Sequence, residues 1–454
     1  MAIAKTMVRP PPPKGPPPRG PPTKRAGGKL PFKSPPGPPK RPPPPPRGPH
    51  SGPAKRTLAS SASRTNGSNA LPAAKKQRQQ QQPGIVPRRS KVSIRLPVVL
   101  RDVDVYEKKR QVGQGTYGSV FVAKDKQTAE IVALKRINTE QEENGFPITA
   151  LREVKILKAL NHPNIVNLKE IVTSKERGAF PKNVFMVFEY LEYDLTGVLE
   201  TPEIRLTQDH VKSWSQQLLN GMHYMHTNKV LHRDLKASNL LVSRNGELKI
   251  ADWGLARSYS SDTKRLTNKV ITLWYRPPEL LLGMMDYSSK IDMWSAGCII
   301  AEMFRRKGFL RGANEATQLD LIFQTCGHPT EEDWPDIRKR CRLWKRFEPK
   351  PGETRRPNRL AQALRDKLPH PKWMTDNAVQ LLVKLMELNP DKRWSAVQAL
   401  DAEYFFETPI VKPADKLSMR FAVSSVHEMD CKRKYEQKLA AQKAAMQRSQ
   451  GGGR

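Results

Sequence analysis

The spacing of apolar residues changes along the chain from a strand-like to a helix-like pattern. Residues 106–112 and 120–123 flank a glycine-rich run, and residues 130–137 and 184–189 are short apolar runs, all of which predict strands. After Pro147, apolar residues recur every three or four positions. Residues 213–226 carry an apolar helical face, and residues 291–300 are apolar on most faces, which predicts a buried helix. The pattern therefore predicts a strand-rich first part and a largely helical second part.

A further hairpin is predicted in the second part, where Asn245-Gly246 separates the apolar runs 240–242 and 248–250. Asp234 precedes the first of these runs, and Asp252 follows the second. We therefore expect the two carboxylates to leave the ends of neighbouring elements.

Composition sets the first 97 residues apart from the rest. The first fifty positions hold 20 of the 41 prolines, and residues 1–100 contain 21 Lys or Arg and no Asp or Glu, out of a net charge of +35. Such a segment cannot build a core, so residues 1–97 are predicted to be a disordered basic tail. Its P-x-x-P repeats could dock on aromatic grooves of other proteins, and its Lys/Arg clusters at 75–78 and 88–91 are candidate nuclear import signals. The tail could also contact RNA weakly, or be only a solvated linker.

The end of the chain, residues 408–454, is also basic and is predicted to be a second disordered tail. Residues 433–447 could form a charged helix that leans on a partner or on nucleic acid, or that stays solvated. The four cysteines have no metal-like or disulfide-like spacing, which favours a reducing compartment. There is no secretory segment and no run of eighteen apolar residues, so we expect no membrane association.

Several residues carry candidate chemistry. Gly113, Gly115 and Gly118 form G-x-G-x-x-G, where missing Cβ atoms let backbone N–H groups approach phosphate oxygens. Taken alone, this motif also fits a dinucleotide-binding domain or a hairpin without a ligand. Lys135 lies within an apolar strand and needs an anionic partner, which Glu153 on the following helix could supply.

The stretch 231–240 brings together a carboxylate, an ammonium and an amide, in Asp234, Lys236 and Asn239. Together with the glycine loop, V-A-L-K around Lys135, Glu153, Asp252-Trp253-Gly254 and Arg276-Pro277-Pro278-Glu279, it resembles the protein-kinase signature set in order and spacing. The resemblance covers roughly residues 100–407. It implies an α+β, bilobal protein kinase fold, with a small β-rich N-lobe at 98–190, a large helical C-lobe at 191–407, and ATP and Mg²⁺ as cofactors.

The resemblance also implies roles for single residues. Asp234 would orient the substrate hydroxyl, Lys236 would steady the phosphoryl group, and Asn239 and Asp252 would hold Mg²⁺. The remaining nucleotide contacts would come from the glycine loop, the strands and the connector: Val112, Gly113, Gly115, Gly118, Val120, Ala133, Lys135, Glu153, Glu189 and Leu191.

The motif PITALRE at 147–153 resembles the cyclin-contacting helix of the cyclin-dependent kinases of transcription elongation, which implies a T- or K-like cyclin partner and a nuclear location. Thr267 matches the activating phosphorylation site of that family. A phosphate there would be clamped by Arg152, Arg233 and Arg257. Thr116 and Tyr117 lie where the family takes inhibitory phosphates.

Val270 and Arg276 resemble the pair that forms a proline-directed substrate pocket. The implied substrates are Ser-Pro and Thr-Pro sites, and for this branch the heptads of the RNA polymerase II carboxy-terminal domain. The alternatives are a nuclear cyclin-dependent kinase with splicing-factor or cell-cycle substrates, and a pseudokinase scaffold that acts through its tails. The presence of all the catalytic residue types argues against the scaffold.

Overall fold

The computed structural model describes residues 100–115, 118–137, 147–174, 183–259, 266–366, 368–417, 419–421 and 423–451. The expected tail at 1–97 and the candidate inhibitory sites Thr116 and Tyr117 lie outside these ranges. Within the described part of the chain, no helix is both long enough and apolar enough to cross a membrane.

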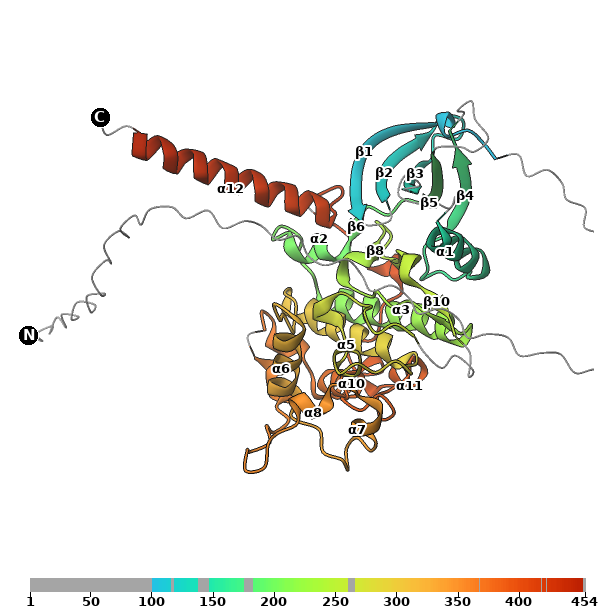
Figure 1. The fold of residues 1–454 in the computed structure, drawn as a ribbon. Helices are drawn as coiled ribbons and strands as arrows, with labels where there is room; N and C mark the ends of the chain where they lie inside the picture. The colour runs from blue at the N-terminus through green and yellow to red at the C-terminus, as the bar shows by residue number, and fades with distance from the viewer. Residues whose placement is uncertain are drawn as a thin grey trace, which may run out of the picture. The chain divides into compact units, whose positions relative to one another are not determined.

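The first lobe is an antiparallel sheet of five strands in the order β1-β2-β3-β5-β4, with one helix, α1, beside it (Figure 1). Its elements are β1 (Tyr106–Gly115), β2 (Gly118–Asp125), β3 (Ile131–Ile137), α1 (Ile148–Ala159), β4 (Leu168–Thr173) and β5 (Val184–Glu189). A separate small core of this lobe is formed by eight buried residues: Val103, Tyr106, Ala123, Val132, Leu134, Val172, Phe185 and Val187.

Helix α1 begins after Pro147, which is tolerated at a helix start because its missing N–H would be unpaired there. The helix buries Ala150, Glu153, Ile156 and Leu157 against the fold. Ile148 and Leu151 stay 71% and 54% exposed, respectively.

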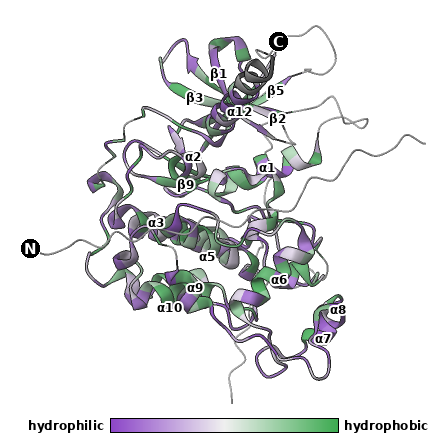
Figure 2. Ribbon diagram, turned by 90° about the vertical axis from the view of Figure 1, so that its left-hand side faces the viewer, coloured by the Kyte–Doolittle hydropathy of each residue, from purple (hydrophilic) through white to green (hydrophobic). Residues whose placement is uncertain are grey.

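The second lobe is mainly helical, and α5 forms its centre, with every residue from Ile291 to Phe304 buried. Helix α3 presents both hydrophilic and hydrophobic residues, as expected of a helix with one buried face (Figure 2). The helices are α2 (Leu195–Glu200), α3 (Gln208–Thr227), α4 (Pro278–Leu281), α5 (Lys290–Arg305), α6 (Glu315–Cys326), α7 (Ile337–Arg340), α8 (Trp344–Phe347), α9 (Leu360–Arg365), α10 (Asp376–Leu385) and α11 (Ala396–Leu400).

Two short sheets of this lobe carry the loops of interest. One has the order β6-β8-β9, from β6 (Tyr193–Asp194), β8 (Leu240–Val242) and β9 (Leu248–Ile250), and the other pairs β7 (Val230–Leu231) with β10 (Arg257–Ser258). The hairpin expected at Asn245-Gly246 is confirmed, with Gly246 at φ +81° between β8 and β9.

A fully buried ion pair ties α4 to the segment before α11. Arg393 donates from Nη1 to Glu279 Oε1 at 2.7 Å and from Nη2 to Glu279 Oε2 at 2.9 Å, and both side chains are 0% exposed. Because either charge left alone would be buried without a partner, the two ends are strongly held together.

After residue 407 the structure departs from the expected disordered tail. Leu417 and Val426 are buried against the second lobe, and α12 (Glu428–Gly451) includes the expected charged helix at 433–447 and extends beyond it at both ends. Helix α12 contacts β1 and α2 at its beginning and then points away from the body (Figure 1). The basic composition concealed this docking, because a few apolar residues and backbone bonds anchor the segment.

Candidate active site

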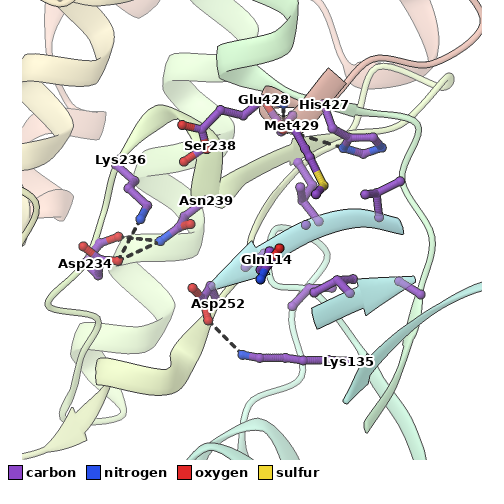
Figure 3. A pocket seen from close by; sticks show the side chains of 18 of the residues that line it. Gln114, Lys135, Asp234, Lys236, Ser238, Asn239, Asp252, His427, Glu428 and Met429 are labelled. Atoms are coloured by element: carbon purple, nitrogen blue, oxygen red, sulfur yellow. Dashed lines mark hydrogen bonds and ion pairs between the residues drawn. The ribbon is translucent and has the colours of Figure 1, made fainter. Parts of the chain in front are cut away.

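A cavity of about 970 Å³ is lined by residues of both lobes and of α12. Nine of the ten residues expected to contact a nucleotide line it, namely Val112, Gly113, Gly118, Val120, Ala133, Lys135, Glu153, Glu189 and Leu191. The tenth, Gly115, pairs with Gly118 at the end of the β1–β2 hairpin. Asp234, Lys236, Asn239 and Asp252 line the same cavity (Figure 3). The structure therefore gathers in one place residues that lie up to 140 positions apart in the sequence.

Lys135 is the buried cation of this cavity. Its Nζ donates to Glu153 Oε1 at 2.8 Å, to Glu153 Oε2 at 3.1 Å and to Asp252 Oδ1 at 2.8 Å. Burial alone would lower the pKa of Lys135, but the two carboxylates outweigh it and raise that pKa. The ammonium is therefore held charged, in a position set by β3 and α1 together.

Asp252 and Asn239 present oxygen atoms to the cavity from two different loops. Asp252 adopts the left-handed backbone conformation, φ +59°, which turns the chain sharply after β9. The charge of Lys135 lowers the pKa of Asp252 to about 2, so its carboxylate is ionised at neutral pH. Ionised carboxylate and amide oxygens are the hard donors that Mg²⁺ prefers, so this pair fits a Mg²⁺–phosphate group. The neighbouring indole of Trp253 is buried and donates to Ile250 O at 3.3 Å.

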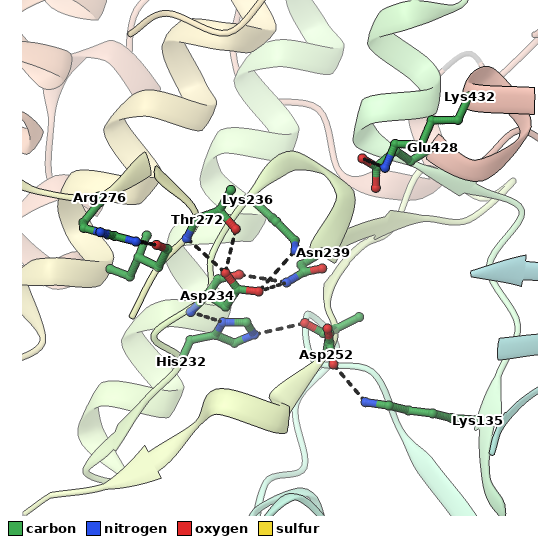
Figure 4. Close-up of polar contacts among 12 residues, drawn as sticks. Lys135, His232, Asp234, Lys236, Asn239, Asp252, Thr272, Arg276, Glu428 and Lys432 are labelled. Atoms are coloured by element: carbon green, nitrogen blue, oxygen red, sulfur yellow. Dashed lines mark hydrogen bonds and ion pairs between the residues drawn. The ribbon is translucent and has the colours of Figure 1, made fainter. Parts of the chain in front are cut away.

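Asp234 lies across the cavity from Lys135, with each carboxylate oxygen held separately (Figure 4). Oδ1 accepts from Thr272 N at 3.2 Å and from Thr272 Oγ1 at 2.9 Å. Oδ2 accepts from Asn239 Nδ2 at 3.2 Å and lies 3.2 Å from Lys236 Nζ. The carboxylate is therefore oriented from both sides, with an ammonium beside it.

A buried framework supports the loop that carries Asp234. Asp292 Oδ2 accepts from His232 N and Asp292 Oδ1 from Arg233 N, both at 3.0 Å. His232 lies 3.0 Å from Ala251 O through Nε2, and burial lowers the pKa of this histidine. The loop before β8 and the turn after β9 are therefore joined by one imidazole.

The segment that follows Asp252 is hydrogen-bonded to the same loop through Arg233. Arg233, at φ +66°, donates from Nε to Leu255 O at 2.8 Å and from Nη1 to Tyr287 Oη at 3.3 Å, and Tyr287 Oη donates to Thr267 O at 2.6 Å. Arg233 is thus linked to the Thr267 residue through one tyrosine.

The other two predicted clamp arginines lie on neighbouring elements. Arg257 is exposed on β10, and α1, which carries Arg152, contacts β10. Burial raises the pKa of Tyr287, and the charges of Arg233 and Arg257 oppose that rise. Among the described residues, only Arg233 of the three clamp arginines is hydrogen-bonded to Tyr287, and no hydrogen bond joins Arg152 to Thr267.

Arg276 holds the backbone carbonyl of Ile271, next to the Thr272 residue that binds Asp234. Its Nε and Nη2 donate to Ile271 O at 3.1 and 2.9 Å, and its Nη1 pairs with Glu315. Ile271 is at φ +68°, an outlier for a β-branched residue, and is followed directly by Thr272. The Ile271 carbonyl is therefore turned toward Arg276 and already accepts two hydrogen bonds from its guanidinium.

Sequence reasoning missed Ile271, Thr272 and Asp292 in this site. A left-handed β-branched residue has no sequence signal, because β-branching argues against that conformation. Asp292 could have been suspected as an acidic residue inside an apolar helix, which needs buried donors as partners. The residues of α12 that line the cavity were also missed.

Comparisons with known proteins agree with this geometry. The protein kinase domain model matches residues 106–405. Cyclin-dependent kinase C-1 of Arabidopsis thaliana is 48% identical over 356 residues, 76% of this chain and 68% of that kinase. Cyclin-dependent kinase 9 of Danio rerio is 45% identical over 323 residues, 69% of this chain and 83% of that kinase.

Among solved structures, the yeast RNA Pol II CTD kinase CTDK-1 complex matches with a TM-score of 0.61 and 39% identity, over 69% of this chain and 97% of that one. The expected bilobal kinase fold is thereby confirmed. The chain belongs to the protein kinase family, as an ATP-dependent serine/threonine kinase of the cyclin-dependent branch that contains cyclin-dependent kinase 9 and the plant C-type kinases.

Proposed function

We propose that the chain, bound to a T- or K-like cyclin, phosphorylates Ser-Pro and Thr-Pro sites in the heptads of the RNA polymerase II carboxy-terminal domain, and so promotes elongation in the nucleus. The relatives named above are cyclin-dependent kinases, and the yeast structure is that of a CTD kinase. A weak RNA contact through the basic tails is a subsidiary part of the proposal.

In this proposal, Asp234 receives the proton of the substrate hydroxyl, and Thr272 and Asn239 keep its two oxygens aligned. Lys236 steadies the transferring group beside it, and Lys135 holds the α- and β-phosphates from the opposite side. Asn239 and Asp252 would hold Mg²⁺, which when bound would neutralise phosphate charge.

The observation that carries the substrate proposal is the occupied carbonyl of Ile271. An ordinary residue after the phosphorylated Ser or Thr would bring an N–H that finds no acceptor there, whereas proline has no N–H. Leaving a donor unpaired costs about 1–3 kcal/mol, which corresponds to a preference of roughly fivefold to 150-fold. Thr272 directly follows Ile271 and donates to Asp234, so this pocket lies beside the proposed catalytic carboxylate.

The test compares kcat/KM for two heptad peptides that differ only by Pro or Ala after the target Ser. The parent complex should prefer the Pro peptide, and Arg276→Ala should reduce the preference toward unity by freeing the carbonyl. Glu315→Gln is the matched control, because it removes the ion pair of Arg276 and keeps both carbonyl bonds.

Asp234→Asn should lower kcat on both peptides by about 10²–10⁴-fold while nucleotide still binds. Equal rates on the two peptides with the parent complex would reject the proline-directed proposal. A splicing-factor Ser-Pro peptide that is turned over faster than the heptads would reject the polymerase domain as the substrate.

A further inference from the structure

Trp274 keeps a large part of its indole in solvent close to the proposed catalytic carboxylate. It follows by two residues the Thr272 that binds Asp234 (Figure 4). It is the most exposed of the chain's eight tryptophans, at 37%. The ring is nevertheless fixed, because its Nε1 donates to Gly312 O at 3.1 Å. An exposed and fixed aromatic ring at this place is a candidate contact for the peptide substrate.

The segment before α6 is held against Trp274 by one buried side chain, that of Gln318. Gln318 Oε1 accepts from Gly312 N at 2.7 Å, and Gln318 Nε2 donates to Leu310 O at 3.3 Å. The same Nε2 donates to Trp274 O at 3.4 Å. Only glycine fits at position 312, because a Cβ there would lie 2.5 Å from the backbone nitrogen of Gln318. The indole and Arg311, which lies between Leu310 and Gly312, are therefore held in one fixed arrangement.

Arg311 lies over this indole as a cation without a carboxylate partner. Its guanidinium carbon is 4.4 Å from the centre of the Trp274 ring, within the range of a cation–π contact. The side chain is exposed, and within the described ranges Arg311 makes no ion pair and no hydrogen bond through its guanidinium. Because a guanidinium is planar, one face can rest on the indole while the other stacks on a second ring.

Neighbouring acidic groups favour a neutral ligand over an anion at Arg311. Burial raises the pKa of Glu302 and of Glu200, and the charge of Arg311 opposes both rises. Both carboxyl groups therefore lie within the electrostatic reach of this guanidinium. A phosphate or carboxylate bound to Arg311 would face them, whereas an aromatic ring brings no charge. A ring is also the kind of group that a guanidinium and an indole both stack on.

The segment that carries Arg311 also contacts the proposed proline pocket. Arg276 of that pocket pairs through Nη1 with Glu315 at 2.6 Å, and Glu315 follows Arg311 by four residues. Thr272 and Trp274 are two residues apart, so their Cα atoms are separated by about 7 Å at most. An extended substrate advances by about 3.3 Å per residue. A substrate side chain that reaches Trp274 therefore comes from a residue within about four positions of the target Ser or Thr.

We propose that Trp274 and Arg311 form a substrate subsite for an aromatic side chain, carried by the peptide within about four positions of the phosphorylated Ser or Thr. The substrate ring stacks on the guanidinium face that the indole leaves open. The subsite determines which Ser-Pro or Thr-Pro sites are phosphorylated fastest, and it takes no part in phosphoryl transfer. The proposal rests on the function proposed above and adds an aromatic residue to the substrate class.

The test measures kcat/KM of the cyclin complex on Ser-Pro peptides in which one tyrosine is placed in turn at each position of that range, against the same peptide with alanine there. At its best position the tyrosine should raise kcat/KM by roughly threefold to tenfold, mainly through a lower KM. Arg311→Ala and Trp274→Leu should each bring the ratio of the two peptides close to one. Cyclohexylalanine, which keeps the bulk of the ring without its π electrons, should give the parent a smaller gain than tyrosine.

Arg346→Ala is the matched control, because Arg346 also lies over an aromatic ring, that of Phe347 on α8, at 5.9 Å from its centre. It should keep the parent's ratio. Thermal melts check the fold, and Arg311→Ala decides alone if Trp274→Leu is unfolded. Equal kcat/KM for the tyrosine and alanine peptides at every position, or a gain that survives Arg311→Ala, would overturn the subsite. A glutamate peptide turned over faster than the tyrosine peptide would also overturn it, in favour of an anion site. A parent complex that phosphorylates none of the Ser-Pro peptides would instead reject the proposed function.

Discussion

At the residue scale, Glu302 shows how burial sets a pH dependence next to the substrate pocket. It lies on α5 and accepts a hydrogen bond from Tyr275 Oη at 2.7 Å, and Tyr275 directly precedes Arg276. Burial raises the pKa of Glu302 from 4.5 to about 7. The folded protein therefore binds this proton more tightly than the unfolded chain does.

The sign of the effect follows from that raised pKa. The stabilisation from the Glu302 proton is fully present below about pH 4.5 and is lost as the pH rises through about 7. Between pH 5.5 and 8.5 the loss should be roughly 2 kcal/mol of unfolding free energy. Glu302→Gln, which cannot ionise, should abolish that part of the slope in denaturant titrations at the two pH values. The exposed Glu315→Gln serves as the control, and a Glu302→Gln slope equal to the parent's would contradict the assignment.

At the element scale, the segment between Asp252 and Glu279 joins regulation to catalysis. Tyr287 connects Arg233 to Thr267 through hydrogen bonds. The carbonyl oxygen of Arg233 also accepts from Ile271 N at 3.0 Å. Ile271 directly precedes Thr272, the threonine that donates to Asp234. A phosphate on Thr267 would add charge-assisted bonds to the predicted clamp arginines, of which Arg233 is already linked to Thr267 through that tyrosine.

Thr267→Ala should therefore lower kcat/KM on the heptad peptide by on the order of tenfold or more, because the segment loses those bonds. Phosphatase treatment should slow the parent complex to the variant's rate and leave the variant unaffected. Ser288→Ala removes an exposed hydroxyl next to Tyr287 and is the matched control. A Thr267→Ala complex as fast as the phosphorylated parent would disprove the arginine clamp.

The sequence predicted elements best where side chains carry the signal. The strands, the Asn245-Gly246 hairpin and α5 followed from periodicity and turn chemistry. What escaped prediction depends on the backbone. The positive φ of Ile271 and the pairing of Val426 with the connector involve N–H and carbonyl groups that every residue has. Only the tertiary fold decides which of those groups meet.

At the scale of the whole molecule, α1 is placed to connect the catalytic cavity with a partner. Its inner face supplies Glu153, which holds Lys135, while its outer face leaves Ile148 and Leu151 largely exposed. Exposed apolar residues beside each other on one helix are typical of an interaction surface. A cyclin bound there would act on the Lys135–Glu153 contact through a rigid helix.

Leu151→Asp should therefore weaken co-purification of the cyclin, because burying a leucine contributes about 1.5–3 kcal/mol and a buried, unpaired carboxylate opposes binding. The apparent affinity should fall by roughly tenfold or more, and kinase activity should fall with it at limiting cyclin. Val397→Asp, on α11 of the other lobe, is the control, because Val397 is a similarly exposed apolar residue, at 48% against 54% for Leu151. Activity that recovers at saturating cyclin would place the defect in binding rather than in catalysis. Undiminished cyclin recovery with Leu151→Asp would exclude this face of α1 as the contact surface.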